Sequence, residues 1–117
     1  MAALEGAGLS VWPVEVGELP RELAATSATA VVCADDETAL LALRACRGYA
    51  VPSQVSVTGL GDARWTRALH PRLTTVRLPA DGCGARAADA ILSPLAAADT
   101  FLPCKLIVRQ STGPAPS

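Results

Sequence analysis

The chain has 117 residues and a net charge of −1, and it is 50% hydrophobic but only 3% aromatic. This length accommodates one domain or a part of one, with a core built from Ala, Val and Leu. The arginines are scattered singly among acids, which argues against nucleic-acid binding, because that function needs clustered positive charge to displace counterions.

The four cysteines and the single histidine do not form a metal-binding pattern. Cys33, Cys46, Cys83 and Cys104 include no CxxC pair, and His70 lies near none of them, whereas metal sites usually contain a closely spaced pair. Such cysteines are typical of buried thiols in a reducing cytosol. The sequence shows no secretory signal and no apolar run of membrane-spanning length. We therefore expect a soluble, cytoplasmic protein without a metal or cofactor.

The first part of the chain predicts short elements. Residues 2–9 resemble the tail of a helix that ends at a glycine, and residues 10–16 resemble a strand. A proline inside that strand suits a sheet edge, because proline cannot donate to a ladder of hydrogen bonds. Residues 18–27 predict a short helix, with Leu19, Leu23 and Ala24 as the candidates for its inward face.

The middle of the chain predicts a strand, a helix and a second strand. Residues 28–34 form an apolar run rich in β-branched side chains, which is typical of a strand covered on both faces. Residues 35–48 have helical spacing of apolar positions, with Asp35 or Asp36 as the capping residue and a glycine at the end. Residues 54–60 follow as the next strand. A right-handed crossover makes the two strands of such a unit parallel.

The last part of the chain continues the alternation. The predicted elements are a helical turn or loop at 62–71, a strand at 73–78, a long helix at 80–98 and a strand at 102–111. The apolar side of the long helix would comprise Cys83, Ala87, Ala88, Ile91, Leu92 and Leu95. The alternation predicts an α/β fold of parallel-sheet βαβ layers.

Acidic residues stand at the ends of two predicted strands. Asp35 and Asp36 follow the first, and Gly61 and Asp62 follow the second. Ligands of parallel sheets bind outside the carboxyl ends of the strands, where carboxylates could accept hydrogen bonds from sugar hydroxyls or base nitrogens. The alternative is an ordinary helix cap and an ordinary turn. No nucleophile, phosphate loop or catalytic pairing of His70 is visible, so we expect no enzyme and no catalytic residue.

Five segments, in this order, resemble the C-terminal part of the LacI/GalR family of bacterial transcriptional regulators. They are SATAVVCADDETALLAL, YAVPSQVSVTGLGD, HPRLTTVRLP, GARAADAIL and LPCKLIVRQSTG, and together they cover residues 28–113. The resemblance implies a partial type I periplasmic-binding-protein-like fold, in which two α/β lobes close on an effector. Closure changes the DNA affinity of an N-terminal helix-turn-helix dimer. On this view residues 1–113 are the C-terminal portion of the effector domain, 80–108 are a remnant of the other lobe, and 114–117 are a disordered tail.

The resemblance also assigns roles to individual positions. Asp35 replaces an effector-contacting Asn of the family, Gly61 replaces the acid that grips the effector, and Asp62 keeps the second acid. The effector would be a sugar or a nucleoside. The family dimerises through this lobe, which makes Leu40, Leu43 and Trp65 candidates for a homodimer interface.

The sequence therefore predicts an effector-binding and dimerisation fragment of a LacI/GalR-type regulator, which would contact DNA only through a domain absent from this chain. It predicts no contact with a membrane. Two alternatives remain open at this point: a sugar-binding protein of a transport system, and an inert truncated product.

Overall fold

The computed structural model describes residues 5–94 and 99–117. The elements, in chain order, are η1 (Val16–Glu18), α2 (Leu19–Ala25), β1 (Ala30–Val32), α3 (Asp36–Ala45), η2 (Cys46–Gly48), β2 (Ser56–Thr58), η3 (Arg64–Ala68), β3 (Thr75–Arg77), α4 (Ala80–Leu92) and β4 (Lys105–Ile107). The start of the helical tail predicted at 2–9 and the predicted inward position of Leu95 lie outside the described residues.

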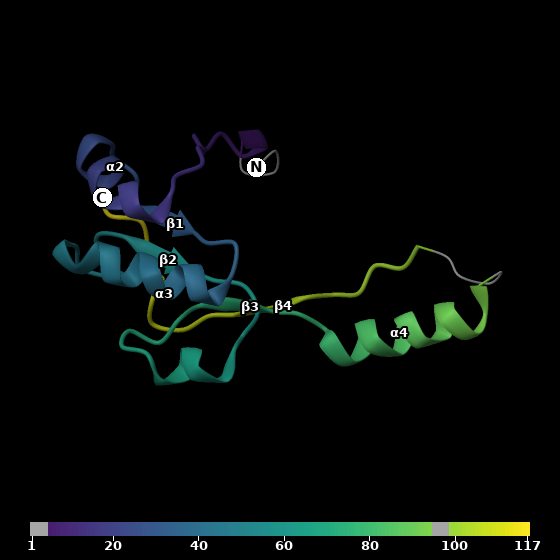
Figure 1. Cartoon of the computed structure of the whole chain (residues 1–117). Coiled ribbons are helices and arrows are strands. Elements are labelled where there is room, and N and C mark those ends of the chain that lie inside the picture. Colours follow the sequence, from purple (N-terminus) through teal and green to yellow (C-terminus); the bar gives the residue numbers. More distant parts are fainter. Residues whose placement is uncertain (1–4, 95–98) are drawn as a thin grey trace.

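The predicted strand–helix–strand unit is confirmed. β1 and β2 pair in parallel, with Val31 opposite Val57, and α3 connects them. The helix begins where expected, because the Asp35 side chain caps it by accepting a hydrogen bond from the Thr38 backbone N–H. Figure 1 shows α3 packed along one side of the strands.

The remaining strands extend this arrangement and then reverse it. Bridges between Thr58 and Thr74 and between Gly61 and Arg77 place β3 parallel to the β2 segment. β4 pairs with β3 in the antiparallel sense, because the chain leaves along β3 and returns along β4. The prediction of a mainly parallel sheet therefore holds for the first three strands and not for the fourth.

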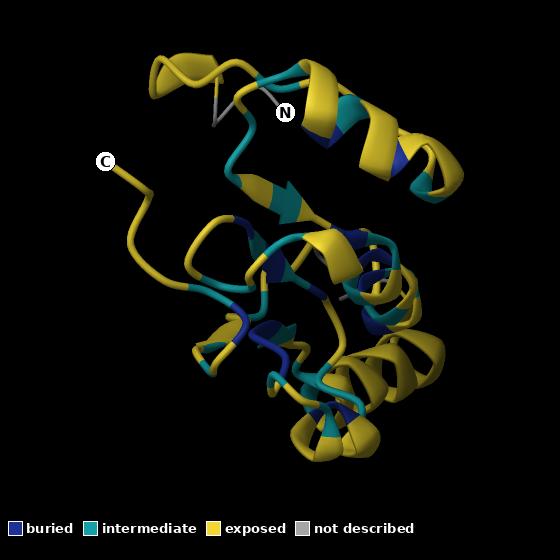
Figure 2. Ribbon diagram, turned by 90° about the vertical axis from the view of Figure 1, so that its left-hand side faces the viewer, coloured by how far each residue is buried: buried dark blue, intermediate teal, exposed yellow. Residues whose placement is uncertain are grey.

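The core lies between α3 and the middle strand. Ala39, Ala42 and Val57 are fully buried there. Small side chains on α3 let the helix approach the strand closely, which suits a sequence poor in aromatic residues. Figure 2 shows the buried positions concentrated in this part of the molecule.

The expectation that β1 is covered on both faces is wrong. Val32 is 71% exposed, and the outer residues of the strand are exposed while its central residue is half-buried. The β-branched run does form a strand, but only Val31 packs against the core, whereas Ala30 and Val32, which point to the opposite face, are exposed.

A projecting segment, which we call the arm, comprises residues 78–94 and 99–104 between β3 and β4. Figure 1 shows it extending away from the rest of the described residues, which we call the pocket lobe. The Cα radius of gyration of 17.1 Å exceeds the value of about 13 Å expected for a compact domain of this length. The arm makes the molecule elongated.

The predicted apolar side of the long helix is exposed. Helix α4 forms, but it contains no buried residue, and Ile91 and Leu92 are 78% and 81% exposed. Cys83, Ala87 and Ala88 are exposed as well. The amphipathic pattern calls for a packing partner, and the pocket lobe does not supply one. The expectation of uniformly buried thiols is likewise wrong at Cys83 and Cys104, whereas Cys33 and Cys46 are buried.

Two predictions near the N-terminus are also wrong. Residues 10–16 form no strand, and their end enters the short helix η1 instead. In α2, Leu19 and Leu23 are buried as predicted, but Ala24 is exposed, because this short helix presents only a narrow stripe to the core. None of the described helices is long and apolar enough to cross a membrane.

Candidate functional site

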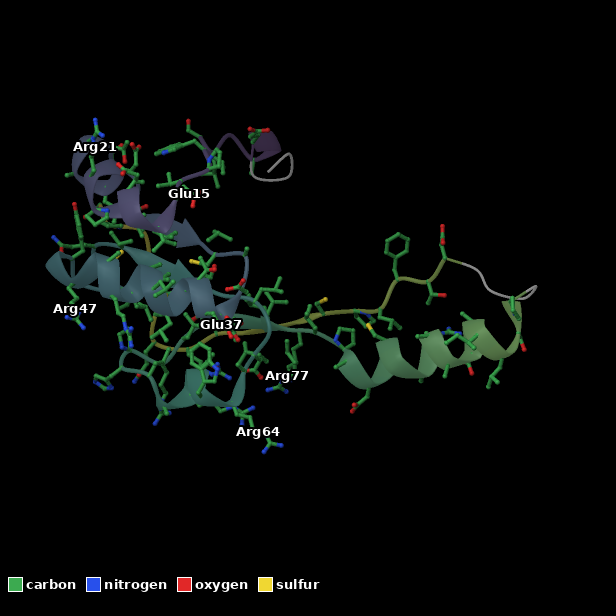
Figure 3. The ribbon with its side chains drawn as sticks, viewed as in Figure 1. Glu15, Arg21, Glu37, Arg47, Arg64 and Arg77 are labelled. Atoms are coloured by element: carbon green, nitrogen blue, oxygen red, sulfur yellow. The ribbon has the colours of Figure 1, made fainter. Side chains whose placement is uncertain are left out.

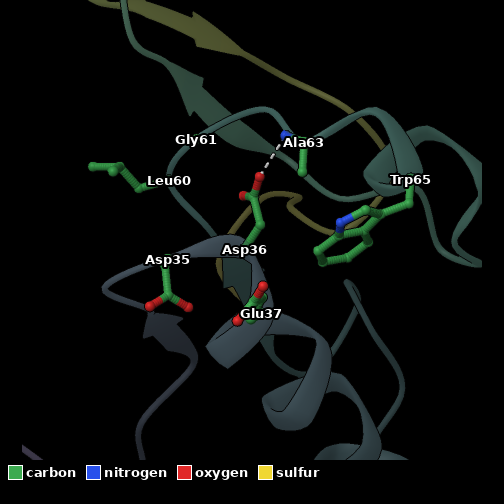
Figure 4. Close-up of a pocket in the computed structure, with 7 residues that line it drawn as sticks. All are labelled: Asp35, Asp36, Glu37, Leu60, Gly61, Ala63 and Trp65. Atoms are coloured by element: carbon green, nitrogen blue, oxygen red, sulfur yellow. Dashed lines mark hydrogen bonds between the residues drawn. The ribbon is translucent and has the colours of Figure 1, made fainter.

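A pocket of about 280 Å³ lies at the carboxyl ends of β1 and β2. It is lined by Asp35, Asp36, Glu37, Leu60, Gly61, Ala63 and Trp65. Figure 4 shows the acids at the start of α3 between Leu60 and Trp65. The structure thus brings together three of the four predicted ligand-contacting residues, Asp35, Asp36 and Gly61, at the edge of the sheet where the sequence placed them.

Asp35 is an exposed residue of the pocket lining. One of its oxygens accepts a hydrogen bond of 2.6 Å from the backbone N–H of Thr38. That hydrogen bond holds the pKa of the Asp35 carboxyl below its usual value. The charged form therefore persists at neutral pH, with its remaining lone pairs available to a ligand.

Asp36 has a different role, because its side chain is committed to the fold. The residue is 4% exposed, and its carboxylate accepts hydrogen bonds from the Thr75 hydroxyl at 2.5 Å and the Ala63 backbone N–H at 2.8 Å. These contacts tie the start of α3 to β3 and to the loop before η3. Asp36 is the floor of the pocket.

The glycines that end the β2 segment are required by this buried acid. A Cβ atom on Gly59 would clash with an Asp36 carboxylate oxygen and would lie 3.2 Å from the Asp36 Cα. Gly61 has φ of +134°, a conformation that L side chains rarely adopt. Glycine, which stands at position 61 in place of the acid expected from the family resemblance, therefore suits the backbone conformation at this strand end.

Asp62, the fourth predicted ligand residue, does not line the pocket. Its side chain is 2% exposed, and its carboxylate forms ion pairs with Arg67, Arg77 and Arg109. Burial by itself disfavours the charged carboxylate, but the hydrogen bonds and charges of Arg109 and Arg77 outweigh it and hold the pKa of Asp62 below its usual value. Asp62 as a ligand contact remains a prediction.

The three candidate interface residues lie in different surroundings. Leu43 is half-buried and packs against the core, and Leu40 is half-buried. Trp65 is 37% exposed and lines the pocket. Their role in a dimer remains a prediction, and for Trp65 the structure adds a position beside the acids that sequence reasoning missed.

Sequence reasoning also missed Glu37, Leu60 and Ala63 as pocket residues. Glu37 and Leu60 are adjacent in sequence to predicted positions, so the strand-end rule could have included them. The lining combines carboxylate acceptors with an indole ring and an aliphatic side chain, and it contains no Lys or Arg. Such a surface accepts hydrogen bonds from hydroxyl groups and packs against the apolar face of a ring. No cluster of His, Cys, Asp or Glu suited to a metal occurs among the described residues.

The pocket is open, and its volume lies just below the roughly 300–1,000 Å³ of sites that enclose a small molecule. A βαβ lobe with an open hollow at its strand ends is the class of structure found in two-lobed binding proteins, where each lobe supplies one wall. In agreement, residues 3–112 match the family model of the periplasmic binding protein-like domain.

The relatives define the family within this class. The chain is 38% identical over 116 residues to the HTH-type transcriptional regulator MalR of Streptomyces coelicolor, covering 92% of this chain and 33% of that protein. Among solved structures, the transcription regulator GntR from Chromobacterium violaceum is 29% identical with a TM-score of 0.77, and the match covers 95% of this chain and 48% of that one.

A LacI family regulator from Enterococcus faecium, whose structure holds bound ribose, is 26% identical with a TM-score of 0.67, over 87% of this chain and 40% of that one. The chain belongs to the LacI/GalR family of transcriptional regulators and corresponds to part of its periplasmic-binding-protein-like effector domain. It spans about a third of the length of the Streptomyces regulator.

Proposed function

We propose that this chain supplies one wall of the effector site of a LacI-type transcriptional regulator and has no enzymatic activity. The observation that carries the proposal is the pocket at the carboxyl ends of β1 and β2, where Asp35 and Glu37 present carboxylates at the start of α3. In such a regulator, effector binding would alter DNA affinity through a separate helix-turn-helix domain. We place the protein in the cytoplasm, as a homodimer.

The lining favours a sugar as the effector. Asp35 and Glu37 are exposed acceptors, which suit the hydroxyl donors of a polyol, and Trp65 offers an aromatic surface for the C–H face of the ring. The absence of Lys and Arg from the lining disfavours a phosphorylated or carboxylated effector. The ribose in the Enterococcus regulator supports the same class for this site. A nucleoside shares the ribose hydroxyls and is the second ligand to test.

We further propose that the arm belongs to the second lobe of the complete effector domain. Helix α4 has an apolar side but no buried residue, so its partner lies outside the described residues. Every residue of α4 except Gly82 is exposed. The matched solved structures are about twice as long as this chain, which provides the additional sequence for such a lobe. A second wall would also enclose a ligand that the open pocket of this chain leaves exposed to solvent.

Tryptophan fluorescence tests the proposal in the chain as it stands. The sequence contains two tryptophans, and Trp12→Phe leaves Trp65 as the only one. We expect D-ribose or adenosine to change the Trp65 emission in a saturable manner. In a Glu37→Gln background the dissociation constant should rise about tenfold, the effect of losing one hydrogen bond to a charged group.

Glu18→Gln is the matched control, because Glu18 is exposed on η1 and contacts only Arg21 among the ion pairs of the described residues. It should leave the titration unchanged. A flat Trp65 signal with every sugar and nucleoside tested, or an equal effect of the two glutamate substitutions, would overturn the proposal.

A further inference from the structure

An ion-pair network centred on a buried carboxylate lies beside the pocket and is not part of its lining. Asp62 is at its centre: one carboxylate oxygen accepts from the Arg109 guanidinium at 2.5 Å, and the other accepts from Arg77 Nε at 2.7 Å and lies 2.6 Å from Arg77 Nη2. Arg67 Nη2 approaches the second oxygen at 3.5 Å. Three cations therefore converge on one carboxylate whose side chain is almost completely buried.

Two of these cations, Arg77 and Arg109, lie on the segments that connect the arm to the pocket lobe, whereas Arg67 lies on η3. Arg77 is the last residue of β3, immediately before the arm, and Arg109 follows β4, by which the chain returns. Arg77 is paired with Lys105 across the two strands. Figure 3 shows Arg77 where the ribbon of β3 and β4 leaves the pocket lobe.

The same network is anchored within the pocket lobe. Arg109 is only 11% exposed, and its second guanidinium nitrogen donates to the Leu73 carbonyl at 2.8 Å and to the Thr66 hydroxyl at 3.1 Å. Its backbone N–H donates to the Thr74 hydroxyl. The guanidinium is thus held by three contacts, with Asp62, Thr66 and Leu73, so the carboxylate that it holds has a fixed position as well.

Asp62 is also the direct neighbour of Gly61, which lines the pocket and donates its N–H to the Val76 carbonyl at 2.8 Å. The backbone of Asp62 has φ of +58°, in the left-handed region that glycine normally occupies. This conformation turns the carboxylate away from the pocket and toward the arginines. Both oxygens of the Asp62 carboxylate are engaged by these arginines.

We propose that Asp62 is a positioning residue, which fixes the direction in which the β3–β4 ribbon carries the arm away from the pocket lobe. In the proposed regulator this residue would link the pocket strand end to the segment that reaches the second lobe. That consequence rests on the proposed function, whereas the positioning role itself does not. Removing the network should therefore free the arm without unfolding the pocket lobe.

The distance between two spin labels tests this role in the absence of any sugar. Cys83 on α4 is a native, exposed attachment site, and Arg47→Cys places the second label at an exposed position of η2. Cys104→Ser removes the other exposed thiol. Burial raises the pKa of the Cys33 thiol to about 11 and raises that of Cys46, so both buried thiols should react slowly with the label.

In this background we expect one narrow distance maximum. Arg77→Gln should broaden the distribution and shift its mean, and Asp62→Asn should do so more strongly. Arg64→Gln is the matched control. Arg64 is an exposed arginine on η3, so this substitution removes the same charge as Arg77→Gln but from outside the network. It should reproduce the parental distribution. Circular dichroism confirms folding, and Arg77→Gln decides the result if Asp62→Asn does not fold.

The proposal is overturned if Arg77→Gln gives the parental distribution, or if the parental distribution is already broad. Because no ligand is added, either result leaves the sugar-binding proposal to its own test. Conversely, a flat Trp65 titration would refute sugar binding without affecting the assigned role of Asp62.

Discussion

Asp35 and Asp36 are neighbours in the chain, yet their carboxylates lie in opposite environments. Asp35 is exposed and caps α3, whereas Asp36 is 4% exposed and holds two donors from distant segments. The sequence predicts that an acid caps this helix, and it leaves open which one. The buried role of Asp36 depends on Thr75, 39 residues away, and no local pattern indicates that contact.

We expect Asp36→Ala to lower the free energy of unfolding by about 2–4 kcal/mol, because it leaves the Thr75 hydroxyl and the Ala63 N–H buried without an acceptor. Asp35→Ala, on the exposed neighbour, should have a clearly smaller effect. Urea denaturation followed by circular dichroism measures both. Equal losses for the two substitutions would contradict the assigned roles.

Asp62 should make stability depend on pH. Its partners Arg67, Arg77 and Arg109 keep the pKa of the folded state below the unfolded value of about 3.9. The stabilisation is therefore fully present above the unfolded pKa and is lost as the pH falls through the folded pKa. Thermal unfolding between neutral and acid pH should show this loss. An Asp62→Asn chain should show a flatter profile over the same range, and an unchanged profile would contradict the assignment.

At the scale of elements, the βαβ unit could be predicted because its signals are local. A β-branched run, an acid at the helix cap, helical spacing and a following strand each depend on a few adjacent residues. The exposure of α4 could not be predicted in the same way. Its amphipathic pattern indicates that a partner is needed, but a periodic pattern does not say where that partner lies. The same limit applies to β1, where the apolar run predicted cover on both faces.

The two long helices should respond differently to glycine. Ala42 on α3 is fully buried, whereas Ala87 on α4 is exposed. Glycine in a helix costs about 1 kcal/mol relative to alanine. We expect Ala42→Gly to lower the free energy of unfolding of the pocket lobe by at least that amount, as reported by Trp65 fluorescence in urea. Ala87→Gly should leave that transition unchanged, and a shared loss would mean that α4 is coupled to the core.

At the scale of the whole molecule, the arm leaves large apolar side chains in contact with water. Ile91, Leu92 and Phe101 are 78%, 81% and 98% exposed. Exposed apolar surface of this kind favours association with another surface. The candidate pocket was predictable from the sequence because strand ends meet at one edge, but the diversion of Asp62 to arginines 15 and 47 residues away was not.

We expect the isolated chain to self-associate through the arm. Leu92→Glu should shift the sedimentation distribution toward the monomer by placing a charge in the exposed apolar surface. Leu40→Glu, on α3 in the predicted family interface, is the matched comparison. A shift produced only by Leu40→Glu would favour the predicted dimer interface over the arm.

The position of a bound sugar tests most directly whether the pocket at the ends of β1 and β2 is the ligand site. Backbone amide chemical shifts of the ¹⁵N-labelled chain can be followed during a titration with D-ribose. We expect saturable shifts at Glu37, Gly61, Ala63 and the Trp65 indole N–H, with the α4 amides unchanged. Saturable shifts confined to residues outside the pocket, or no shifts at any ribose concentration, would show that this pocket is not the ligand site.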